Sequence, residues 1–424
     1  MRIAMFTDVF PPSINGVASS VLLLSKELVK RGHYVKIFTP SVQKKDRISK
    51  KKLEGIEVSY CASLPSLIYP DIKLGLPFYP NTVYQLVKDK IDVVHFHTPL
   101  FMGADGILAA KMAGKPIVGT FHTYFMEPEY LKVIGLNIMG NTVEKVLVKL
   151  GWTYANLYYN SADLITTPTE STRKALVRYK IKRPTKTISN GIRLPQLPAS
   201  DLNKHHFSKK LLYVGRLSKE KNLDVVIKAF KIVHAAEPKY TLTIVGSGPV
   251  ENDLKQLAQQ EGLEKSITFT GSVPFEKLLG SDIYTDAALF VTASTSETQG
   301  LSIIEGMSYG LPVVAVAKRG VPELIKDNGL LCKTANAKDL ATNILKIIRT
   351  PALAKKMSQA SLKRADKYSI GAITTQFEQV YARLIKSKKA KQEKSEKSLV
   401  SLATSFTKTF TKSMASKIAK VATG

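Results

Sequence analysis

The feature that most constrains the fold is a regular alternation of short apolar runs with helical patterns. Residues 2–10 (RIAMFTDVF) are typical of a strand, residues 17–32 repeat apolar side chains at helical spacing, and residues 33–40 return to a strand pattern. Gly32 supplies the stop signal of the helix. A strand–helix–strand unit of this kind predicts two parallel strands joined by a right-handed crossover.

The same alternation continues along the chain and then restarts. Further strand patterns occur at residues 91–99, 115–124, 162–170, 209–217, 240–248, 266–273, 287–294 and 311–317. A turn-rich stretch over residues 189–206, with Pro195 and Pro198, separates the two series and is typical of a linker. The sequence therefore predicts an α/β protein with two doubly wound parallel domains, over residues 1–195 and 205–370.

Charge is the part of the composition that bears on function. The 424 residues include 62 Lys+Arg and 34 Asp+Glu, a formal net charge of +28. Residues 1–200 carry +13, residues 201–382 carry +6 and residues 383–424 carry +9. This distribution predicts an anionic partner for the two ends of the chain rather than for its middle. The two cysteines, Cys61 and Cys332, cannot form a disulfide framework, which fits a reducing cytosol.

The most informative motif lies at residues 294–315 (STSETQGLSIIEGMSYGLPVVA). A polar loop with Glu297 and Gly300 follows a strand pattern and leads into a short helix. A glycine-bearing loop at a helix N-terminus offers free N–H groups to an anion such as a pyrophosphate. The carboxylates of Glu297 and Glu305 suit sugar or ribose hydroxyls. The alternative for Glu305 is an ordinary capping box with Ser302.

The spacing of Glu297 and Glu305 after a strand resembles the signature of retaining glycosyltransferases of family 4, which have the GT-B fold. Three further stretches agree in order: 7–21 (TDVFPPSINGVASSV), 118–123 (VGTFHT) and 213–230 (YVGRLSKEKNLDVVIKAF). The resemblance extends from residue 1 to about 382. It implies two Rossmann-like domains that face a central cleft, the first binding the acceptor and the second the nucleotide-sugar donor.

The resemblance assigns the donor diphosphate to Arg216 and Lys221, as groups that also stabilise the leaving nucleotide. A five-residue gap after a strand end places both cations on one loop, and a departing diphosphate needs positive charge or a metal ion. With these two cations, no metal or other cofactor is expected. The alternative is that Arg216 and Lys221 are two solvated surface cations.

The resemblance also assigns the sugar and phosphate contacts. Glu297 would bind the donor hexose, and Glu305 would bind the ribose hydroxyls. The amides of Gly300 and Leu301 would bind the phosphates. Gly16 would let the backbone approach the donor, where a side chain would obstruct it.

His122 follows the strand pattern of residues 115–124, and the resemblance places it near the donor sugar hydroxyls as a positioning and polarising group. Together with His95 and His97 it could alternatively form a metal site, although no cysteine or carboxylate cluster completes the shell. Asp8, at the end of the first strand pattern, could contact the acceptor or cap a loop.

The segment 246–249 (GSGP) lacks the third glycine of a dinucleotide fingerprint, so NAD binding is not expected. Pro249 is predicted at the first position of the following helix. By the resemblance, Ser272 and Val273 lie near the nucleotide base and contact it through their backbone.

Two basic segments predict contact with an anionic membrane surface, since each Lys or Arg near such a surface adds about 1 kcal/mol of attraction. One is residues 44–52 (KKDRISKKK). The other is the tail over 386–424, in which residues 399–424 repeat apolar side chains at helical spacing. The alternatives for the tail are a disordered segment or one that packs on a partner. The last helix, about 370–385, is predicted to pack on the first domain.

The expected function is a retaining hexosyltransferase that uses a nucleotide sugar, with UDP-glucose as a candidate donor, and glycosylates a membrane lipid, most directly diacylglycerol. The expected location is the inner face of the cell membrane, reached from the cytoplasm. Alternatives are a phosphatidylinositol mannosyltransferase, a family 4 enzyme with a soluble acceptor, a nucleotide-sugar epimerase of similar fold, and a basic binding protein with a degenerate site. Nucleic acid is not expected, because zinc-ligand spacings and RNP-like strands are missing. The hexose, the base and the oligomeric state stay open.

Overall fold

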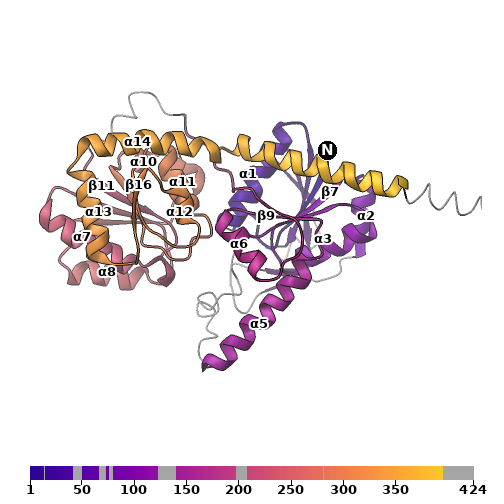
Figure 1. Cartoon of the computed structure of the whole chain (residues 1–424), viewed down its shortest axis with the longest axis horizontal. Coiled ribbons are helices and arrows are strands. Elements are labelled where there is room, and N and C mark those ends of the chain that lie inside the picture. The colour runs from indigo at the N-terminus through magenta and orange to yellow at the C-terminus, as the bar shows by residue number, and fades with distance from the viewer. Residues whose placement is uncertain are drawn as a thin grey trace, which may run out of the picture.

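The structure is a computed structural model that describes residues 1–13, 15–41, 50–65, 73–75, 80–122, 140–196, 208–279 and 281–394. It shows two α/β domains side by side, with the N-terminal and C-terminal halves of the chain forming one domain each (Figure 1). Both central sheets are built mainly from parallel strands, as the strand–helix alternation predicts. The segment 399–424 and residues 44–49 of the basic cluster lie outside the described residues.

The N-terminal sheet has eight strands in the described part of the chain, in the order β10-β9-β8-β7-β1-β2-β4-β3. Their bounds are β1 (Arg2–Phe6), β2 (Tyr34–Pro40), β3 (Lys50–Leu53), β4 (Ile56–Cys61), β7 (Val93–Phe96), β8 (Ile117–Thr120), β9 (Leu164–Thr167) and β10 (Thr185–Thr187). The strand order reverses between β1 and β7. Loops at the carboxyl ends of two such strands form the usual binding site of a doubly wound sheet.

The helices of this domain are α1 (Gly16–Lys30), α2 (Pro80–Lys88), α3 (Phe101–Met112), α5 (Gly140–Tyr159) and α6 (Glu170–Arg178). A small ribbon is formed by β5 (Ser63–Pro65) and β6 (Lys73–Gly75). The edge strand β3 pairs antiparallel with β4, which the strand–helix pattern does not predict. It carries the described end of the basic cluster, and Lys51 and Lys52 are exposed there, as charged residues on an edge strand commonly are.

The C-terminal sheet has six parallel strands among the described residues, in the order β13-β12-β11-β14-β15-β16. They are β11 (Lys210–Val214), β12 (Thr241–Val245), β13 (Ile267–Gly271), β14 (Leu289–Val291), β15 (Val313–Val316) and β16 (Gly329–Cys332). The order reverses between β11 and β14. The loops that follow these two strands therefore flank the switch point of the second domain.

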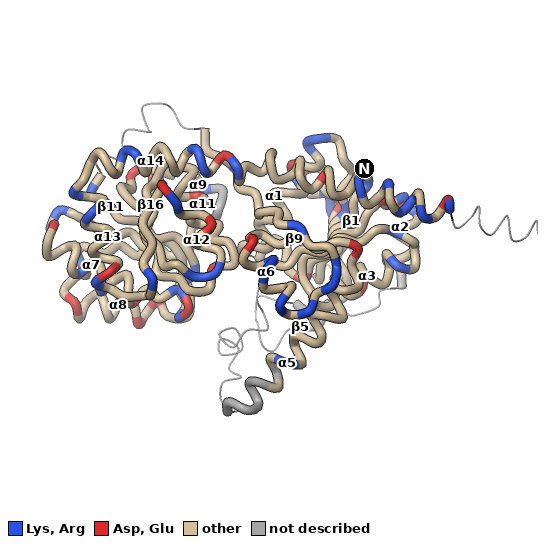
Figure 2. Tube along the Cα trace, viewed as in Figure 1, with Lys and Arg blue, Asp and Glu red and all other residues tan. Residues whose placement is uncertain are grey.

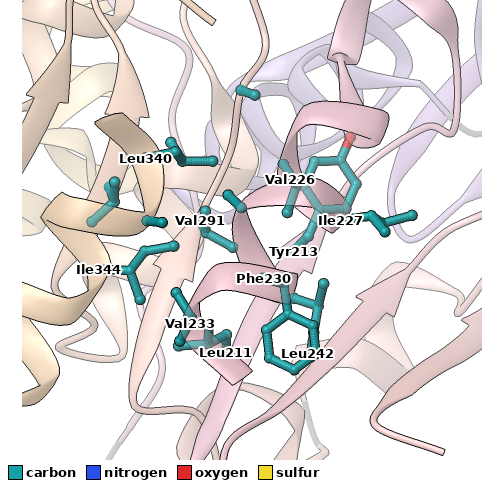
Figure 3. Close-up of a cluster of buried hydrophobic side chains, with 14 of the residues drawn as sticks. Leu211, Tyr213, Val226, Ile227, Phe230, Val233, Leu242, Val291, Leu340 and Ile344 are labelled. Atoms are coloured by element: carbon teal, nitrogen blue, oxygen red, sulfur yellow. The ribbon is translucent and has the colours of Figure 1, made fainter. Parts of the chain in front are cut away.

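Helices cover both faces of this sheet. They are α7 (Leu223–Ala236), α8 (Glu251–Gln260), α9 (Phe275–Leu279), α10 (Asp282–Thr285), α11 (Leu301–Ser308), α12 (Val321–Leu324), α13 (Ala337–Ile348) and α14 (Pro351–Ala365), with short 3₁₀ turns η4 (Lys219–Lys221) and η5 (Asp366–Tyr368). On one face, Val226, Phe230 and Val233 of α7 meet Leu340 and Ile344 of α13 over the strands (Figure 3). This core holds the two site-bearing strands in fixed register.

The chain returns to the N-terminal domain after α14. Residues 370–394 form a helix that runs along the first domain (Figure 1). Its side chains Ile373, Phe377 and Tyr381 pack into the same hydrophobic cluster as Val93 of β7. Arg31 at the end of α1 binds Glu378 of this helix at 2.6 Å. Within the described residues, no helix is long and apolar enough to cross a bilayer.

Candidate active site

The loop between β14 and α11 ends in a helix N-terminus without a side-chain cap. Gly300 is the N-cap residue, with φ of 90°, a conformation that favours glycine. Within the described chain, no hydrogen bond uses the backbone N–H groups of Gly300 and Leu301. Free N–H donors at the positive end of a helix dipole commonly bind anions, so this helix N-terminus is a candidate anion site.

Lys221 and Glu297 meet beside this anion site. Lys221 ends the turn η4 after β11, and Glu297 lies in the loop after β14, so the pairing of the two strands brings the loops together. Lys221 Nζ lies 2.5 Å from Glu297 Oε1, and each side chain is 18% exposed. Burial raises the pKa of Glu297, but the charge and the hydrogen bond of Lys221, together with a smaller influence of Ser294, outweigh burial, and the net pKa is lowered. The site therefore holds an ionised carboxylate and an adjacent cation.

Arg216 lies on the same loop, between β11 and η4. Its side chain is exposed and forms no ion pair with any described residue, so its guanidinium is available for an anion. The loop also packs closely against the turn after β12, because a Cβ on Gly248 would lie 2.1 Å from the carbonyl oxygen of Leu217. The glycines of the 246–249 segment thus serve backbone packing. The helix prediction for Pro249 is wrong: α8 begins at Glu251, and Pro249 lies in the preceding turn.

Glu305 is not part of a capping box. Gly300 rather than Ser302 caps α11, and Glu305 points instead to α10, where its Oε2 accepts a hydrogen bond of 2.9 Å from the Tyr284 hydroxyl. Burial raises the pKa of Glu305 to about 7, although the bond from Tyr284 acts in the opposite direction. A buried carboxyl that titrates near neutrality is a common feature of functional sites.

The two domains meet at Gly16. This residue begins α1, and a Cβ placed on it would lie 3.3 Å from Leu301 Cδ1 at the start of α11. The N-termini of α1 and α11 thus lie close together where the two domains meet. Val273 packs against the same hydrophobic cluster as Leu301, and Ser272 beside it is exposed.

His122 follows β8 and is linked to the switch point of the first domain. Its Nε2 lies 3.2 Å from Nδ1 of His97, which follows β7. Burial lowers the pKa of His122 to about 4, so its imidazole is neutral at physiological pH. A neutral imidazole can orient a hydroxyl through a hydrogen bond, but it lacks the second N–H proton that an imidazolium can release as a general acid.

His95 serves the packing of the fold. Its two ring nitrogens lie 2.7 Å from the Tyr381 hydroxyl and 2.6 Å from Thr120 Oγ1. Among the described residues, no group of three His, Cys, Asp or Glu side chains is arranged to hold a metal ion. In this structure the rings of His95 and His97 are in contact, and His97 and His122 share a hydrogen bond.

Asp8 follows β1 and is the cap of α3. Its Oδ1 accepts a hydrogen bond of 3.0 Å from the amide of Met102, and its Oδ2 accepts one of 2.5 Å from Thr98 Oγ1. The N-cap residue of α3, Leu100, has no side-chain acceptor of its own. Burial raises the pKa of Asp8 to about 6. Of the two sequence-based alternatives for Asp8, the structure shows the capping role.

Three residues that the sequence did not single out connect the second domain to the first. Two of them lie in the loop before α11, and the third lies in α12. The carbonyl of Thr298 accepts a hydrogen bond from Thr169 Oγ1 at 3.1 Å, and Gln299 Oε1 accepts one of 2.9 Å from the amide of Asn190. The carboxylate of Glu323 accepts the two first amides of α6, at 2.8 and 2.6 Å. The sequence signal for Glu323 is weak, because a cap on a helix of another domain follows no local spacing.

Two doubly wound domains, with a lysine–glutamate pair near an uncapped helix N-terminus on the second, are the arrangement expected of a GT-B glycosyltransferase. The family described as "Glycosyltransferase Family 4" matches residues 14–195, and the family described as "Glycosyl transferases group 1" matches residues 200–364. The chain belongs to glycosyltransferase family 4, as its motifs predict.

Similar proteins agree with this membership. The alpha-monoglucosyldiacylglycerol synthase of Streptococcus pneumoniae is 31% identical over 396 residues, which cover 88% of this chain and 86% of that protein. The protein of the same description from Acholeplasma laidlawii is 26% identical over 410 residues, covering 92% and 99%. The crystal structure of Anabaena HepE in complex with UDP-glucose superposes with a TM-score of 0.68 at 19% identity, covering 90% of this chain and all of that one. The last likeness shows the GT-B fold.

Proposed function

We propose that the protein transfers a hexose from a nucleotide sugar to a membrane lipid, with retention of the anomeric configuration, and that diacylglycerol is the acceptor. The observation that carries the proposal is the Lys221–Glu297 pair beside the uncapped N-terminus of α11. It combines a cation, free amides and an ionised carboxylate within one switch point. Cations and amide donors suit the diphosphate of a nucleotide sugar, and a carboxylate suits the hydroxyls of its hexose.

The donor is bound by the second domain. The diphosphate lies against the amides of Gly300 and Leu301, with Arg216 and Lys221 as counter-charges, so no metal ion is needed to neutralise it. Glu297 accepts hydrogen bonds from the hexose hydroxyls and Glu305 from those of the ribose. Ser272 and Val273 border the base. UDP is the expected nucleotide, which is supported by the nucleotide in the HepE complex.

The reaction exchanges one bond at the anomeric carbon. The bond from this carbon to the diphosphate oxygen breaks while the acceptor hydroxyl oxygen bonds to the same face of the sugar. The acceptor proton passes to the departing diphosphate oxygen, whose charge Arg216 and Lys221 stabilise. His122, neutral because burial lowers its pKa to about 4, orients a donor sugar hydroxyl.

The acceptor assignment is supported by two relatives that are described as alpha-monoglucosyldiacylglycerol synthases and are similar over most of the chain. That description belongs to those two proteins. On its basis we propose that the acceptor of this chain is likewise a lipid with a free hydroxyl. The N-terminal domain is the acceptor side, and the net charge of +13 over residues 1–200 favours an anionic membrane surface. We place the enzyme on the inner face of the cell membrane as a peripheral protein.

The test is transfer of labelled sugar from UDP-glucose, UDP-galactose and GDP-mannose to diacylglycerol, phosphatidylinositol and water-soluble sugars. The proposal is supported if diacylglycerol yields a radioactive product in the organic phase and if NMR shows that an α-linked donor gives an α-linked product. Product only in the aqueous phase, transfer only to phosphatidylinositol, or interconversion of the donor sugar refutes it. The Glu297→Gln variant is the control for background transfer.

A further inference from the structure

Positive charge alone does not distinguish Lys221 in this protein. The chain carries a formal net charge of +28, and Figure 2 shows Lys and Arg residues over the surface of both domains. In contrast to a solvated cation, Lys221 holds its Nζ 2.5 Å from Glu297 Oε1, and only 18% of its side chain is exposed. A cation stabilises a transition state best when it is in place before the reaction begins. The contacts that hold the backbone of Lys221 therefore bear on function.

The residue that follows Lys221 has an unusual backbone. Asn222 has φ of 50° and ψ of 44°, the left-handed conformation that favours glycine. Asparagine is one of the few other residues that adopt it routinely. Asn222 both ends the turn η4 and begins α7, so its conformation sets the direction in which the chain leaves Lys221. Glycine would supply this conformation as well, and the side chain of Asn222 therefore needs an explanation of its own.

The side chain of Asn222 does not cap its own helix. Asparagine is among the best N-cap residues, because its side-chain oxygen accepts a hydrogen bond from the first turn. Asn222 is the N-cap residue of α7, yet its side chain makes no such bond. Its Nδ2 instead donates to the carbonyl of Ala293 at 3.0 Å and lies 3.4 Å from Thr295 Oγ1. Since a carbonyl oxygen can only accept, the amide nitrogen and not the amide oxygen faces Ala293.

A backbone hydrogen bond reinforces this bridge between the two loops. The amide of Thr295 donates to the carbonyl of Glu220 at 3.3 Å. Glu220 and Asn222 are the two neighbours of Lys221 in the chain, and Thr295 precedes Glu297 by two residues. The loop of Lys221 is thus tied to the loop of Glu297 on both sides of Lys221. The lysine side chain extends from a backbone that is fixed at two points.

We propose that Asn222 is a positioning residue for the transfer reaction: its side-chain amide ties the loop of Lys221 to the loop after β14 and so fixes Lys221 at the departing diphosphate. This inference rests on the proposed function, in which Lys221 stabilises the charge that develops on that diphosphate. Asn222 acts through Lys221. Glycine would keep the backbone conformation and lose the bridge, and aspartate would turn a carboxylate oxygen toward the carbonyl of Ala293. Of these three residue types, only asparagine supplies an amide donor.

The experiment uses full-length wild type, Asn222→Gly, Lys221→Ala and the double variant, assayed for transfer from UDP-glucose to diacylglycerol. We expect Asn222→Gly to lower kcat about tenfold, because a displaced catalytic group loses part of its effect. The KM for the donor should stay within about twofold, since the other donor contacts are intact. The matched control is Lys90→Gly, which places glycine at an exposed left-handed residue after α2, with φ of 47°, and should leave kcat unchanged.

The double variant separates positioning from a merely structural role. Beside Lys221→Ala, the change Asn222→Gly should cause no further loss of kcat, because no ammonium is left to position. Calorimetric binding of UDP gives the same comparison without turnover, since its terminal phosphate carries the charge that the departing group develops. Asn222→Gly should weaken UDP binding about threefold when Lys221 is present and leave it unchanged beside Lys221→Ala. Thermal midpoints by circular dichroism verify that each variant is folded.

The results distinguish this inference from the proposed function. Wild-type kcat in Asn222→Gly, with Lys221→Ala impaired, overturns the inference and leaves the proposed function standing. An equal loss of kcat from Asn222→Gly with and without Lys221 also overturns it, because Asn222 would then support the fold and not the position of Lys221. Wild-type kcat in Lys221→Ala refutes the proposed role of Lys221 in the reaction, and the positioning role of Asn222 falls with it.

Discussion

The replacement Glu305→Gln tests the electrostatics of the donor site most directly. Glu305 is 9% exposed, and its Oε2 accepts one hydrogen bond, from Tyr284. Burial raises the pKa of this carboxyl from 4.5 to about 7. A glutamine has the same shape, still accepts the bond from Tyr284 through its amide oxygen, and carries no charge at any pH.

The sign of the effect follows from the direction of the shift. Because the folded-state pKa of Glu305 lies above the unfolded-state value, the stability associated with its neutral form is complete below pH 4.5 and is lost as the pH rises through about 7. A shift from 4.5 to about 7 corresponds to a penalty of about 3 kcal/mol for the ionised folded protein. Glu305→Gln removes this penalty. The variant should therefore exceed wild type in unfolding free energy by about 1 kcal/mol at pH 5 and about 3 kcal/mol at pH 8.

The assay is urea unfolding of both proteins at pH 5 and pH 8, followed by far-UV circular dichroism. Glu297→Gln is the matched control. Because Lys221 lowers the pKa of Glu297, replacing Glu297 should reduce the free energy of unfolding at pH 8. In the proposed function, Glu305→Gln also weakens nucleotide-sugar binding by about 1.5–3 kcal/mol, through loss of a charged acceptor for the ribose. Two results would refute this account of the site: a Glu305→Gln variant that is less stable than wild type at pH 8, or a difference in unfolding free energy that is the same at pH 5 and pH 8.

Three further outcomes are expected. Lys221→Ala should lower kcat by about 10²–10³-fold in steady-state transfer assays, the usual cost of losing one electrostatic donor to the transition state; near-normal turnover would remove Lys221 from the reaction. The ratio of wild-type to His122→Gln rates should be constant from pH 5.5 to 8, because burial lowers the pKa of His122 to about 4; an inflection near pH 6.5 would show that His122 titrates there. Deletion of 399–424 should weaken sedimentation with anionic vesicles and leave nucleotide binding intact; unchanged sedimentation contradicts a membrane role of the tail.

The parts of the site that the sequence predicts are those that follow strand ends. Lys221 and Glu297 are 76 residues apart, yet each follows a strand whose apolar pattern is plain, and β11 and β14 pair in the sheet. Parallel strands place their carboxyl ends at one edge, so loop residues of such strands converge whatever lies between them. The same reasoning predicts the position of His122 beyond β8. The family motifs add the order in which these residues follow one another along the chain.

The residues that the sequence did not reveal depend on contacts between elements. Tyr284 reaches Glu305 from α10, and Glu323 caps α6 from the other domain, so neither contact has a characteristic spacing. The role of Asp8 was open because a carboxylate after a strand serves a ligand or a helix N-terminus equally well. The exposure of Leu150 and Leu157 on α5 was not predicted for another reason. Periodicity predicts that apolar residues are buried, and it cannot separate a packed side of a helix from an exposed one.

The loop from Glu297 to Gly300 belongs to both domains at once. Its ends carry the carboxylate of Glu297 and the free amide of Gly300. Its middle residues, Thr298 and Gln299, are hydrogen-bonded to Thr169 and Asn190 of the first domain. A donor that orders the ends of this loop also fixes its middle, and the first domain in place fixes the ends. In the proposed function the donor contacts the ends of this loop. By linkage, any free energy by which donor binding strengthens the contact between the two domains equals the free energy by which that contact strengthens donor binding.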